Sequence, residues 1–383
     1  GEMPNLGDII KYSKPPGQLT TRNFVLLGDP ALKIDYPNHR VNTTKVMVNG
    51  EEIGQDNQVD TIQSLQLVTL EGEIVDYEGQ RVEDFNGEVF PVLFDKPKQS
   101  TTLGNDLGSS PFNFEQQTQV LWKGKSSVEN GVFSTSFVVP VDMSQRMEKG
   151  KVSFYARSET EDATGVFNDF ILWGIDENAA TDNTGPQIDL YINDTTFVSG
   201  DQTHDDPVLL AFLSDEHGIN LSTNGIGHNI TAVLDEDYSN IMLMDDYFEL
   251  DMNDYKKGKI TFPFHDLGNG MHTLTLKAWD SYTNSNEATI KFYINKEAGL
   301  NLSEVKNYPN PFRDETVFSF RHTKPGTQIN VKLEIYKLFG KFILSYETDL
   351  FSEGTELDFL TWDGRDVNGN RLGSGIYVYN ITI

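Results

Sequence analysis

The sequence predicts an all-β protein built from tandem β-sandwich domains, and three observations point to this class. Short runs rich in β-branched and aromatic residues recur along almost the whole chain of 383 residues. Turn pairs such as Asn49-Gly50 and Asn130-Gly131 separate these runs. Within several runs apolar and polar residues alternate, as at Phe133 and Phe137, which is typical of a sheet with one solvated face.

Residues 1–40 contain the only helical pattern that we identify. Apolar residues recur at helical spacing from Leu6 to Tyr12, and Pro15-Pro16-Gly17 ends the pattern. A short strand is expected over residues 24–27. In the following turn, Gly28-Asp29-Pro30, we interpret Asp29 as a turn acceptor in preference to a catalytic carboxylate. One helix and one strand cannot form a core, so this segment is expected to pack against another domain.

The first β-domain is predicted over residues 41–185. Its long polar segment, residues 99–119, is interpreted as a surface hairpin loop, and a flap over a catalytic domain is the less favoured alternative. Trp122 and Trp173 are interpreted as core anchors. The predicted strands cover residues 44–48, 65–70, 89–94, 131–140 and 151–156.

A second β-domain is predicted over residues 186–299, after the turn-rich linker Asp182-Asn-Thr-Gly-Pro186. The predicted strands cover residues 187–192, 207–213, 230–234, 259–264, 272–279 and 288–294. The last two strands and the polar turn between them resemble the closing hairpin of bacterial immunoglobulin-like domains. This architecture carries many functions, so it implies little about activity.

The C-terminal β-domain is predicted over residues 300–383. We expect the hexapeptide Asn307-Tyr-Pro-Asn-Pro-Phe312 to be a stiff, extended entry into it. The reason is that proline fixes its own φ and biases the preceding residue toward extended conformations. About 75 residues in an antiparallel sandwich are enough for a small core. The predicted strands cover residues 316–320, 329–336, 341–346, 357–362 and 375–383.

The chain is strongly acidic, and the charge is unevenly distributed. The formal net charge is −28, of which −26 lies in residues 1–299. Such a surface repels nucleic-acid phosphates and anionic lipids, so we expect neither as a partner. The chain has no cysteine, which excludes a disulfide, a Cys nucleophile or a Cys-ligated metal within it. No apolar run approaches the roughly 20 residues of a membrane-spanning helix, so no transmembrane segment is predicted.

Acidic clusters in the second β-domain raise the question of a calcium site. Asp215-Glu216, Asp235-Glu236-Asp237 and Asp245-Asp246 could converge at a loop end, where Ca²⁺ would find oxygen ligands. Their spacing matches no calcium motif, so a solvated acidic rim is the favoured interpretation, and no metal or cofactor is predicted. The histidines of this domain lack metal-ligand spacing and are interpreted as structural: His204, His217, His228, His265 and His272.

Two sets of motifs in the first two thirds of the chain resemble known families. The segment from Asn5-Leu-Gly-Asp-Ile-Ile-Lys11 to Asn23-Phe-Val-Leu-Leu-Gly-Asp-Pro30 resembles the end of the catalytic region of gingipain-type cysteine peptidases, a caspase-like α/β fold. Asp182-Asn-Thr-Gly-Pro186, Ser214-Asp-Glu-His-Gly-Ile-Asn220 and Gly225-Ile-Gly-His-Asn-Ile-Thr231 resemble, in this order, the C-terminal half of the type IX secretion sortases of Bacteroidetes. This resemblance implies an exported protein at the outer membrane and cell surface.

The C-terminal domain carries the most specific motif. It resembles the FlgD-like immunoglobulin-like domain of flagellar hook caps and the C-terminal sorting domain of type IX secretion cargo. Cargo sorting domains usually end in a basic tail, whereas Ile381-Thr-Ile383 does not, which favours a domain retained on the secretion machinery. We expect the glycines at turns with positive φ, two aspartates as turn caps and the tryptophan in the core. The motif residues are Pro309, Asn310, Pro311, Gly340, Trp362, Asp363, Gly364, Asp366, Gly369, Gly375 and Tyr377.

These resemblances imply a region without a catalytic centre of its own. We expect the non-catalytic C-terminal region of a cell-surface type IX secretion sortase, a C-terminal signal peptidase, with the catalytic His and Cys of a gingipain-like cysteine endopeptidase upstream. The expected partners are that peptidase domain, other outer-membrane proteins of the secretion and attachment complex, and cargo sorting domains. Two alternatives are a secreted adhesin or cargo protein with a C-terminal sorting domain, and a calcium- or carbohydrate-binding β-sandwich.

Overall fold

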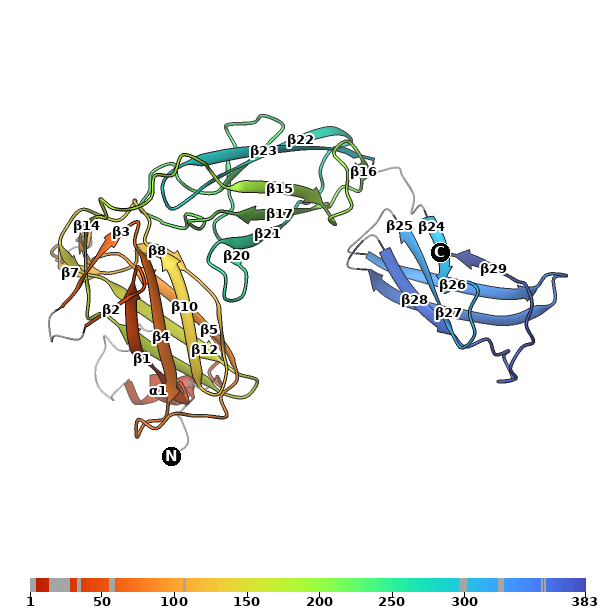
Figure 1. Ribbon diagram of the computed structural model, residues 1–383, viewed down its shortest axis with the longest axis horizontal. Helices are drawn as coiled ribbons and strands as arrows, with labels where there is room; N and C mark the ends of the chain where they lie inside the picture. The colour runs from red at the N-terminus through yellow and green to blue at the C-terminus, as the bar shows by residue number, and fades with distance from the viewer. Residues whose placement is uncertain are drawn as a thin grey trace.

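The computed structural model of the chain is nearly all-β, which confirms the predicted fold class (Figure 1). It describes residues 5–13, 28–32, 36–54, 59–105, 108–295, 302–322, 327–352, 354 and 356–383. No helix within these ranges is long and apolar enough to cross a membrane. The strand predicted over residues 24–27 lies outside them.

The predicted helix is present as α1 (Leu6–Ser13). Asn5 caps it, since its Oδ1 accepts the Asp8 N–H at 2.8 Å. Asp29 lies in the next described segment, residues 28–32. Its Oδ1 accepts the Ala31 N–H at 2.8 Å, which confirms Asp29 as a turn acceptor. No residue of α1 is buried among the described residues, and the packing expected of this segment stays a prediction.

The first sandwich contains all five strands predicted for it. Its strands are β1 (His39–Val48), β2 (Glu51–Ile53), β3 (Thr61–Ser64), β4 (Leu67–Val75), β5 (Gly87–Phe94), β6 (Lys98–Thr101), β7 (Asn113–Gln116), β8 (Val120–Lys123), β9 (Ser126–Val128), β10 (Val132–Val138), β11 (Glu148–Lys149), β12 (Lys151–Arg157), β13 (Asp162–Phe167) and β14 (Ile171–Ile175). A nine-stranded sheet has the order β10-β4-β1-β13-β12-β5-β8, with β2 beside β1 and β9 beside β5. A second sheet has the order β11-β14-β3, and its Ile62 and Leu172 join the core of the large sheet.

Of the two tryptophans predicted as core anchors in the first sandwich, one is buried and the other is exposed. Trp122 is buried and stacks on Phe137 with ring centroids 4.5 Å apart, as predicted. The prediction for Trp173 is wrong, because 47% of its surface is exposed. It follows the buried Leu172 on β14, and successive side chains of a strand face opposite sides. The polar segment 99–119 contains the exposed hairpin of β6 and β7, which confirms its surface interpretation.

The second sandwich contains all six strands predicted for it. Its strands are β15 (Gln187–Ile192), β16 (Gln202–Thr203), β17 (Val208–Ser214), β18 (Thr231–Leu234), β19 (Met242–Leu243), β20 (Phe248–Leu250), β21 (Lys257–Pro263), β22 (Gly270–Trp279) and β23 (Ser285–Ile294). They form two sheets, of order β15-β17-β21-β20 and β16-β23-β22-β18-β19. Leu274, Leu276 and Ala278 alternate into the core from β22, and β23 adds Ile290 and Phe292.

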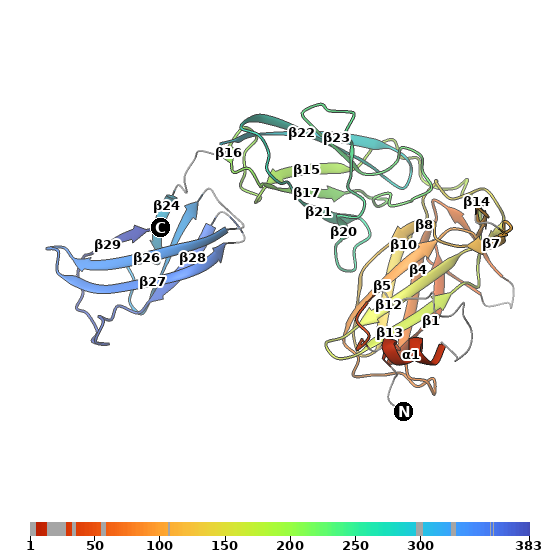
Figure 2. The same ribbon diagram turned by 180° about the vertical axis from the view of Figure 1, so that it is seen from behind.

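The first and second sandwiches share one hydrophobic core cluster, and Figures 1 and 2 show them end to end. Backbone hydrogen bonds cross between them, from Val141 N–H to Ser281 O at 3.1 Å and from Thr223 N–H to Val120 O at 2.8 Å. The β20–β21 hairpin reaches back beside the first sandwich, where Asn253 Oδ1 accepts the Ser127 N–H at 2.8 Å. We name the junction around these residues the seam.

The C-terminal sandwich has a core of its own. Its strands are β24 (Leu302–Tyr308), β25 (Thr316–His322), β26 (Thr327–Lys337), β27 (Phe342–Ser352), β28 (Glu356–Trp362) and β29 (Tyr377–Thr382). They form two sheets, of order β24-β25-β28 and β27-β26-β29. Buried residues such as Phe320 and Leu333 form a hydrophobic cluster that is separate from the shared core of the first two sandwiches.

The expected extended entry at Asn307–Phe312 is wrong. Asn307 pairs with Phe318 in the antiparallel ladder of β24 and β25, so the chain is already inside the sheet at this point. The prolines then lie in the connection between these two strands, and both of their peptide bonds are cis. Thr316 Oγ1 donates to the Pro309 carbonyl at 2.9 Å and closes the connection. The hexapeptide is therefore an internal turn of the domain, not a linker before it.

The separate cores predict separate responses to core mutations. Leu333→Ala should destabilise the C-terminal sandwich by about 2–5 kcal/mol, because it removes a buried side chain and leaves a cavity. Segment-resolved hydrogen–deuterium exchange should show lower protection in β24–β29 and unchanged protection in β1–β23. Phe339→Ala is the matched control, because Phe339 is 97% exposed and its loss should change stability by less than about 0.5 kcal/mol. Equal loss of protection in all three sandwiches would contradict independent cores.

Candidate functional site

Most of the C-terminal motif residues selected from the sequence line one groove of the C-terminal sandwich. The groove has a volume of about 620 Å³. It lies between the β24–β25 turn and the segment that leads into β29, so it is bordered by both sheets. Seven motif residues line it: Asn310, Pro311, Trp362, Asp363, Gly364, Gly375 and Tyr377. Pro309, Gly340, Asp366 and Gly369 are not among its lining residues.

Trp362 forms the floor of the groove at the end of β28. It is 6% exposed, and its Nε1 donates to the Arg365 carbonyl at 2.9 Å. Its ring lies 5.5 Å from that of Phe312 and 5.9 Å from that of Tyr377, measured between centroids. A buried indole that also satisfies its N–H fits the predicted place of this tryptophan in the core.

The loop after Trp362 is shaped by its aspartates and glycines. Asp366 Oδ1 accepts the N–H groups of Asn368 and Asn370, both at 2.9 Å, and these hydrogen bonds lower the pKa of Asp366. Gly364 and Gly369 have φ values of 75° and 78°, which residues with a Cβ rarely adopt. Asp363 Oδ1 accepts the Arg365 N–H at 3.1 Å. The loop that borders the groove is thus held by side-chain acceptors and by backbone conformations that glycine permits.

The lining of the groove combines apolar and cationic side chains. Neither a histidine nor a cysteine is among its lining residues in the described chain. Its walls combine apolar side chains with the guanidinium groups of Arg313 and Arg371. Ile376, on the rim, is 72% exposed. Such a mixture of apolar and cationic groups can receive a protein segment with apolar and acidic side chains.

A second constellation lies near the seam and brings together residues that are distant in sequence. Ligand atoms of Asp182, Glu216 and His217 lie within 4.8 Å of one another, and so do those of Asp182, Asp215 and Asp280. Asp215-Glu216 was selected from sequence, whereas Asp182 and Asp280 were not. Both lie in turn-forming stretches rich in Asn, Ser and Thr, and only the fold shows that these turns meet.

Burial and like charge determine the protonation of this acidic cluster. Burial raises the pKa of Asp215 to about 6, and the neighbouring Asp280 and Asp182 carboxylates add to the rise. Burial also raises the pKa of Asp280. For Asp182, burial is outweighed by hydrogen bonds from Thr184 and His217, so its pKa is lowered. The cluster therefore favours a shared proton or a cation, and oxygen ligands of this kind suit Ca²⁺.

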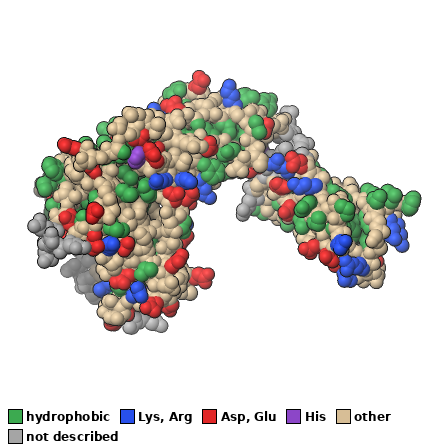
Figure 3. Space-filling view, viewed as in Figure 1, with side chains coloured by type: hydrophobic (Ala, Val, Ile, Leu, Met, Phe, Trp, Pro, Cys, Tyr) green, Lys and Arg blue, Asp and Glu red, His purple; other side chains and the backbone are tan. Residues whose placement is uncertain are grey.

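The other two acidic clusters do not converge with this one. Asp235 Oδ1 accepts the Thr273 N–H at 2.8 Å, and Asp245 Oδ1 accepts the Ile230 N–H at 3.2 Å. Burial raises the pKa of Asp245, so it is not a solvated rim residue. Figure 3 likewise shows acidic side chains spread over the visible face of the first two sandwiches. The less favoured alternative, in which all three clusters converge at one calcium site, is not supported, because the turns that carry them belong to different strand connections.

Three of the five histidines interpreted as structural hydrogen-bond to aspartates, whereas the side chain of His265 is 79% exposed. His217 contacts Asp182 at 2.8 Å and His228 contacts Asp142 at 2.9 Å. His272 contacts Asp235 at 2.7 Å and the Gly268 carbonyl at 2.7 Å. Among the described residues, no group of three closely spaced possible metal ligands contains more than one histidine. The contact of His228 with Asp142 crosses the seam, and the contacts of His217 and His272 hold turns and a strand end.

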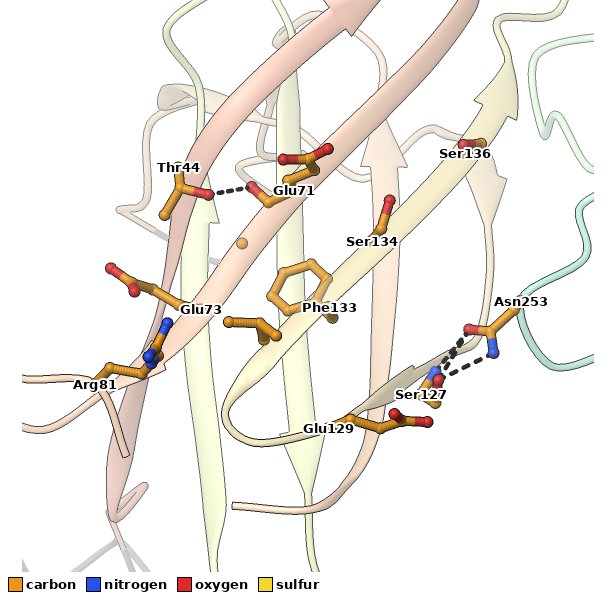
Figure 4. Close-up of a pocket in the computed structure, with 12 residues that line it drawn as sticks. Thr44, Glu71, Glu73, Arg81, Ser127, Glu129, Phe133, Ser134, Ser136 and Asn253 are labelled. Carbon is orange, nitrogen blue, oxygen red and sulfur yellow. Dashed lines mark hydrogen bonds between the residues drawn. The ribbon is translucent and has the colours of Figure 1, made fainter. Parts of the chain in front are cut away.

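A polar concave face lies on the first sandwich beside the β20–β21 hairpin (Figure 4). Its volume is about 720 Å³, and Glu71, Glu73 and Arg81 contribute charges of both signs. The Phe133 ring lies over Gly72, where an added Cβ would come within 2.4 Å of the ring. Asn253 of the hairpin closes one side by its hydrogen bonds to Ser127. Arg81 donates to Glu83 and Glu73 accepts from Asn42, so charged groups of this face bond to neighbours outside it.

The pKa of Asp215 predicts a pH-dependent stability. A folded-state pKa of about 6 against an ordinary value of 3.8 means that the folded chain binds this proton more tightly than the unfolded chain. The free energy of unfolding should therefore fall as pH rises from about 4 to about 6, by about 1–3 kcal/mol. Asp215→Asn should remove this slope and raise stability at pH 8, as measured by urea denaturation at several pH values. The exposed neighbour Glu216, as Glu216→Gln, is the control, and an unchanged slope in the Asp215 variant would contradict the assignment.

Comparisons with known proteins find similarity among solved structures. No protein-family model and no curated protein matches the chain. Among solved structures, the chain is similar to dimeric latent PorU from Porphyromonas gingivalis, with 30% sequence identity and a TM-score of 0.44. The match covers 99% of this chain and 36% of that one, so the chain spans just over a third of the length of PorU.

Two other solved structures have much lower sequence identity. The FN1–FN3 domains of chicken CNTN1 are 9% identical, with coverage of 89% of this chain and 92% of that one and a TM-score of 0.23. A bacterial ice-binding adhesin is 11% identical, with coverage of 84% and 86% and a TM-score of 0.18.

Proposed function

We propose that the chain serves as the non-catalytic β-sandwich region of a type IX secretion sortase at the bacterial cell surface. In this role it braces a gingipain-like peptidase domain and docks on outer-membrane partners of the secretion and attachment complex. The observation that carries the proposal is the sorting-type motif, most of whose residues line one groove. The 30% sequence identity with PorU over 99% of this chain supports it.

We assign catalysis to a different domain of such a sortase. This chain has no cysteine and therefore no cysteine nucleophile. We propose that residues 1–40 are the end of the peptidase domain, that residues 41–185 and 186–299 form the brace, and that residues 300–383 form the docking domain. The shared core of the first two sandwiches supports a rigid brace, and the separate core of the third supports a docking unit that folds independently.

A cargo protein or surface adhesin with a sorting domain is the second candidate. The observation that favours it is the same C-terminal motif, because cargo sorting domains carry it too. The two functions differ in which molecule depends on the C-terminal sandwich. A sortase region affects the processing of other proteins, whereas a cargo sorting domain affects only the export of its own chain.

Deletion of residues 302–383 from the chromosomal gene separates these two candidates. For a sortase region, secreted cargo should keep its C-terminal sorting signals, as seen by mass spectrometry of outer-membrane and culture fractions. The remaining sandwiches should keep their melting temperature, because their core does not include the deleted residues. Normal cargo processing, with loss of only this protein from the surface, would instead identify a cargo protein or adhesin.

A point substitution tests the groove itself. Ile376→Asp places a carboxylate on its rim, where docking would remove the charge from water. We expect about tenfold weaker retention in the outer-membrane fraction, equivalent to roughly 1.4 kcal/mol. Val367→Asp is the matched control, because Val367 is a similarly exposed aliphatic residue outside the groove. Equal retention of both variants, or equal loss, would argue against docking through the groove.

A further inference from the structure

A buried amine and a buried carboxylate lie at the seam, outside the groove of the proposed function. Lys96 and Asp95 directly follow β5, and each is 1% exposed. Side chains of this kind are rarely buried so completely unless they are paired. Lys96 Nζ donates to Asp95 Oδ1 at 3.1 Å and to the Ser144 carbonyl at 2.5 Å.

The second oxygen of the same carboxylate holds a side chain from the second sandwich. Asn224, in the connection between β17 and β18, donates its Nδ2 to Asp95 Oδ2 at 2.6 Å. The Ser144 N–H donates to the same oxygen at 3.0 Å. Asn224 Oδ1 is buried and has no hydrogen-bond partner in the described chain. A hydrogen-bonding role alone accounts poorly for this carboxamide, because a buried oxygen without a donor is unfavourable.

The carboxylate of Asp95 thus holds an amine and a carboxamide on its two oxygens. We propose that Lys96 and Asn224 form an intramolecular amide cross-link across the seam, with Asp95 carrying the proton. The Lys96 amine attacks Asn224 Cγ, so that a new C–N bond forms and the Cγ–Nδ2 bond breaks. Asp95 takes a proton from the attacking nitrogen through Oδ1 and delivers one to Nδ2 through Oδ2, and Nδ2 leaves as ammonia. Amine plus carboxamide gives secondary amide plus ammonia, and neither an oxidant nor a co-reactant is needed.

The environment of Lys96 suits this reaction. An amine attacks only in its neutral form, and burial lowers the pKa of Lys96. Burial also excludes the water that would compete for the carboxamide carbon. Because the seam holds both groups on one carboxylate, the reaction is effectively unimolecular, which lowers its barrier.

The cross-link would join the first and second sandwiches through a covalent bond. Lys96 belongs to the first sandwich and Asn224 to the second, and both lie at the junction where they share their core. A covalent bond there restricts the unfolded chain in the way that a disulfide does, which suits a chain without cysteine. This inference does not depend on the proposed function.

Mass spectrometry of the full chain tests the proposal. The purified chain should have an intact mass lower than its sequence mass by one ammonia. A tryptic digest should contain a branched peptide in which the Lys96 side chain is joined to Asn224. A succinimide at Asn224-Gly225 would lose the same ammonia but would give no branched peptide. An unmodified mass, or the loss of ammonia without the branched peptide, overturns the proposal.

Variants identify the role of each group. Asn224→Asp should give the same branched peptide with loss of water in place of ammonia, and Asn224→Ala should restore the full sequence mass. Lys96→Met should also restore it, whereas Lys98→Met, at an exposed lysine two residues along, should leave the cross-link intact. The wild-type measurement and the Asn224 variants keep the test decisive if Lys96→Met does not fold. A branched peptide that persists in Asn224→Ala would overturn the assignment.

Discussion

The seam depends on buried carboxylates of the first sandwich that accept hydrogen bonds from the second. Asp95 accepts from Asn224, while Asp142 accepts from Asn220 at 2.7 Å and contacts His228 at 2.9 Å. A carboxylate removed from water needs such donors to replace its hydration. The donor side chains of the second sandwich must therefore remain hydrogen-bonded to these carboxylates while water is excluded from the seam. This requirement fixes how the two sandwiches meet, and with it the position of the acidic cluster nearby.

The C-terminal sandwich is stabilised independently of the seam. Its hydrophobic cluster is separate, and its groove is built from its own strands and turns. Trp362 connects the two properties, because the same ring packs in the core and forms the floor of the groove. Changes at the seam and changes in the groove should therefore act on different units of the molecule.

Much of the fold could be predicted from sequence because strand alternation is a local signal. The strands around Val68, Leu274 and Leu333 have the expected side-chain periodicity. Strand β14 was not predicted, and Trp173 was placed in the core, because sequence alone does not show which face of a short strand is covered. The β24–β25 turn was predicted as a linker, because local proline preferences do not reveal the pairing of Asn307 with Phe318.

In the candidate sites, too, residues that are close in sequence could be predicted, whereas contacts between distant segments could not. Motif spacing identified seven of the residues that line the groove, since the motif follows consecutive turns and strands. It did not identify Asp182 and Asp280, or the contact of Asp95 with Asn224, because these contacts join segments far apart in the chain. Contacts of this kind become visible only when the sheets are assembled.

The pairing of β1 with β13 has a consequence for how the chain folds. His39 lies beside Ala163 in a parallel ladder, so the centre of the large sheet joins segments that are far apart in sequence. Before β13 is made, this edge of β1 is paired by β2 at Val46–Val48, whereas His39 and Arg40 have no partner there. Sheets with such non-local pairing close late and fold slowly, since loop entropy is lost before the strand contacts form. During synthesis or export, the first sandwich should therefore be the part that most needs protection from aggregation.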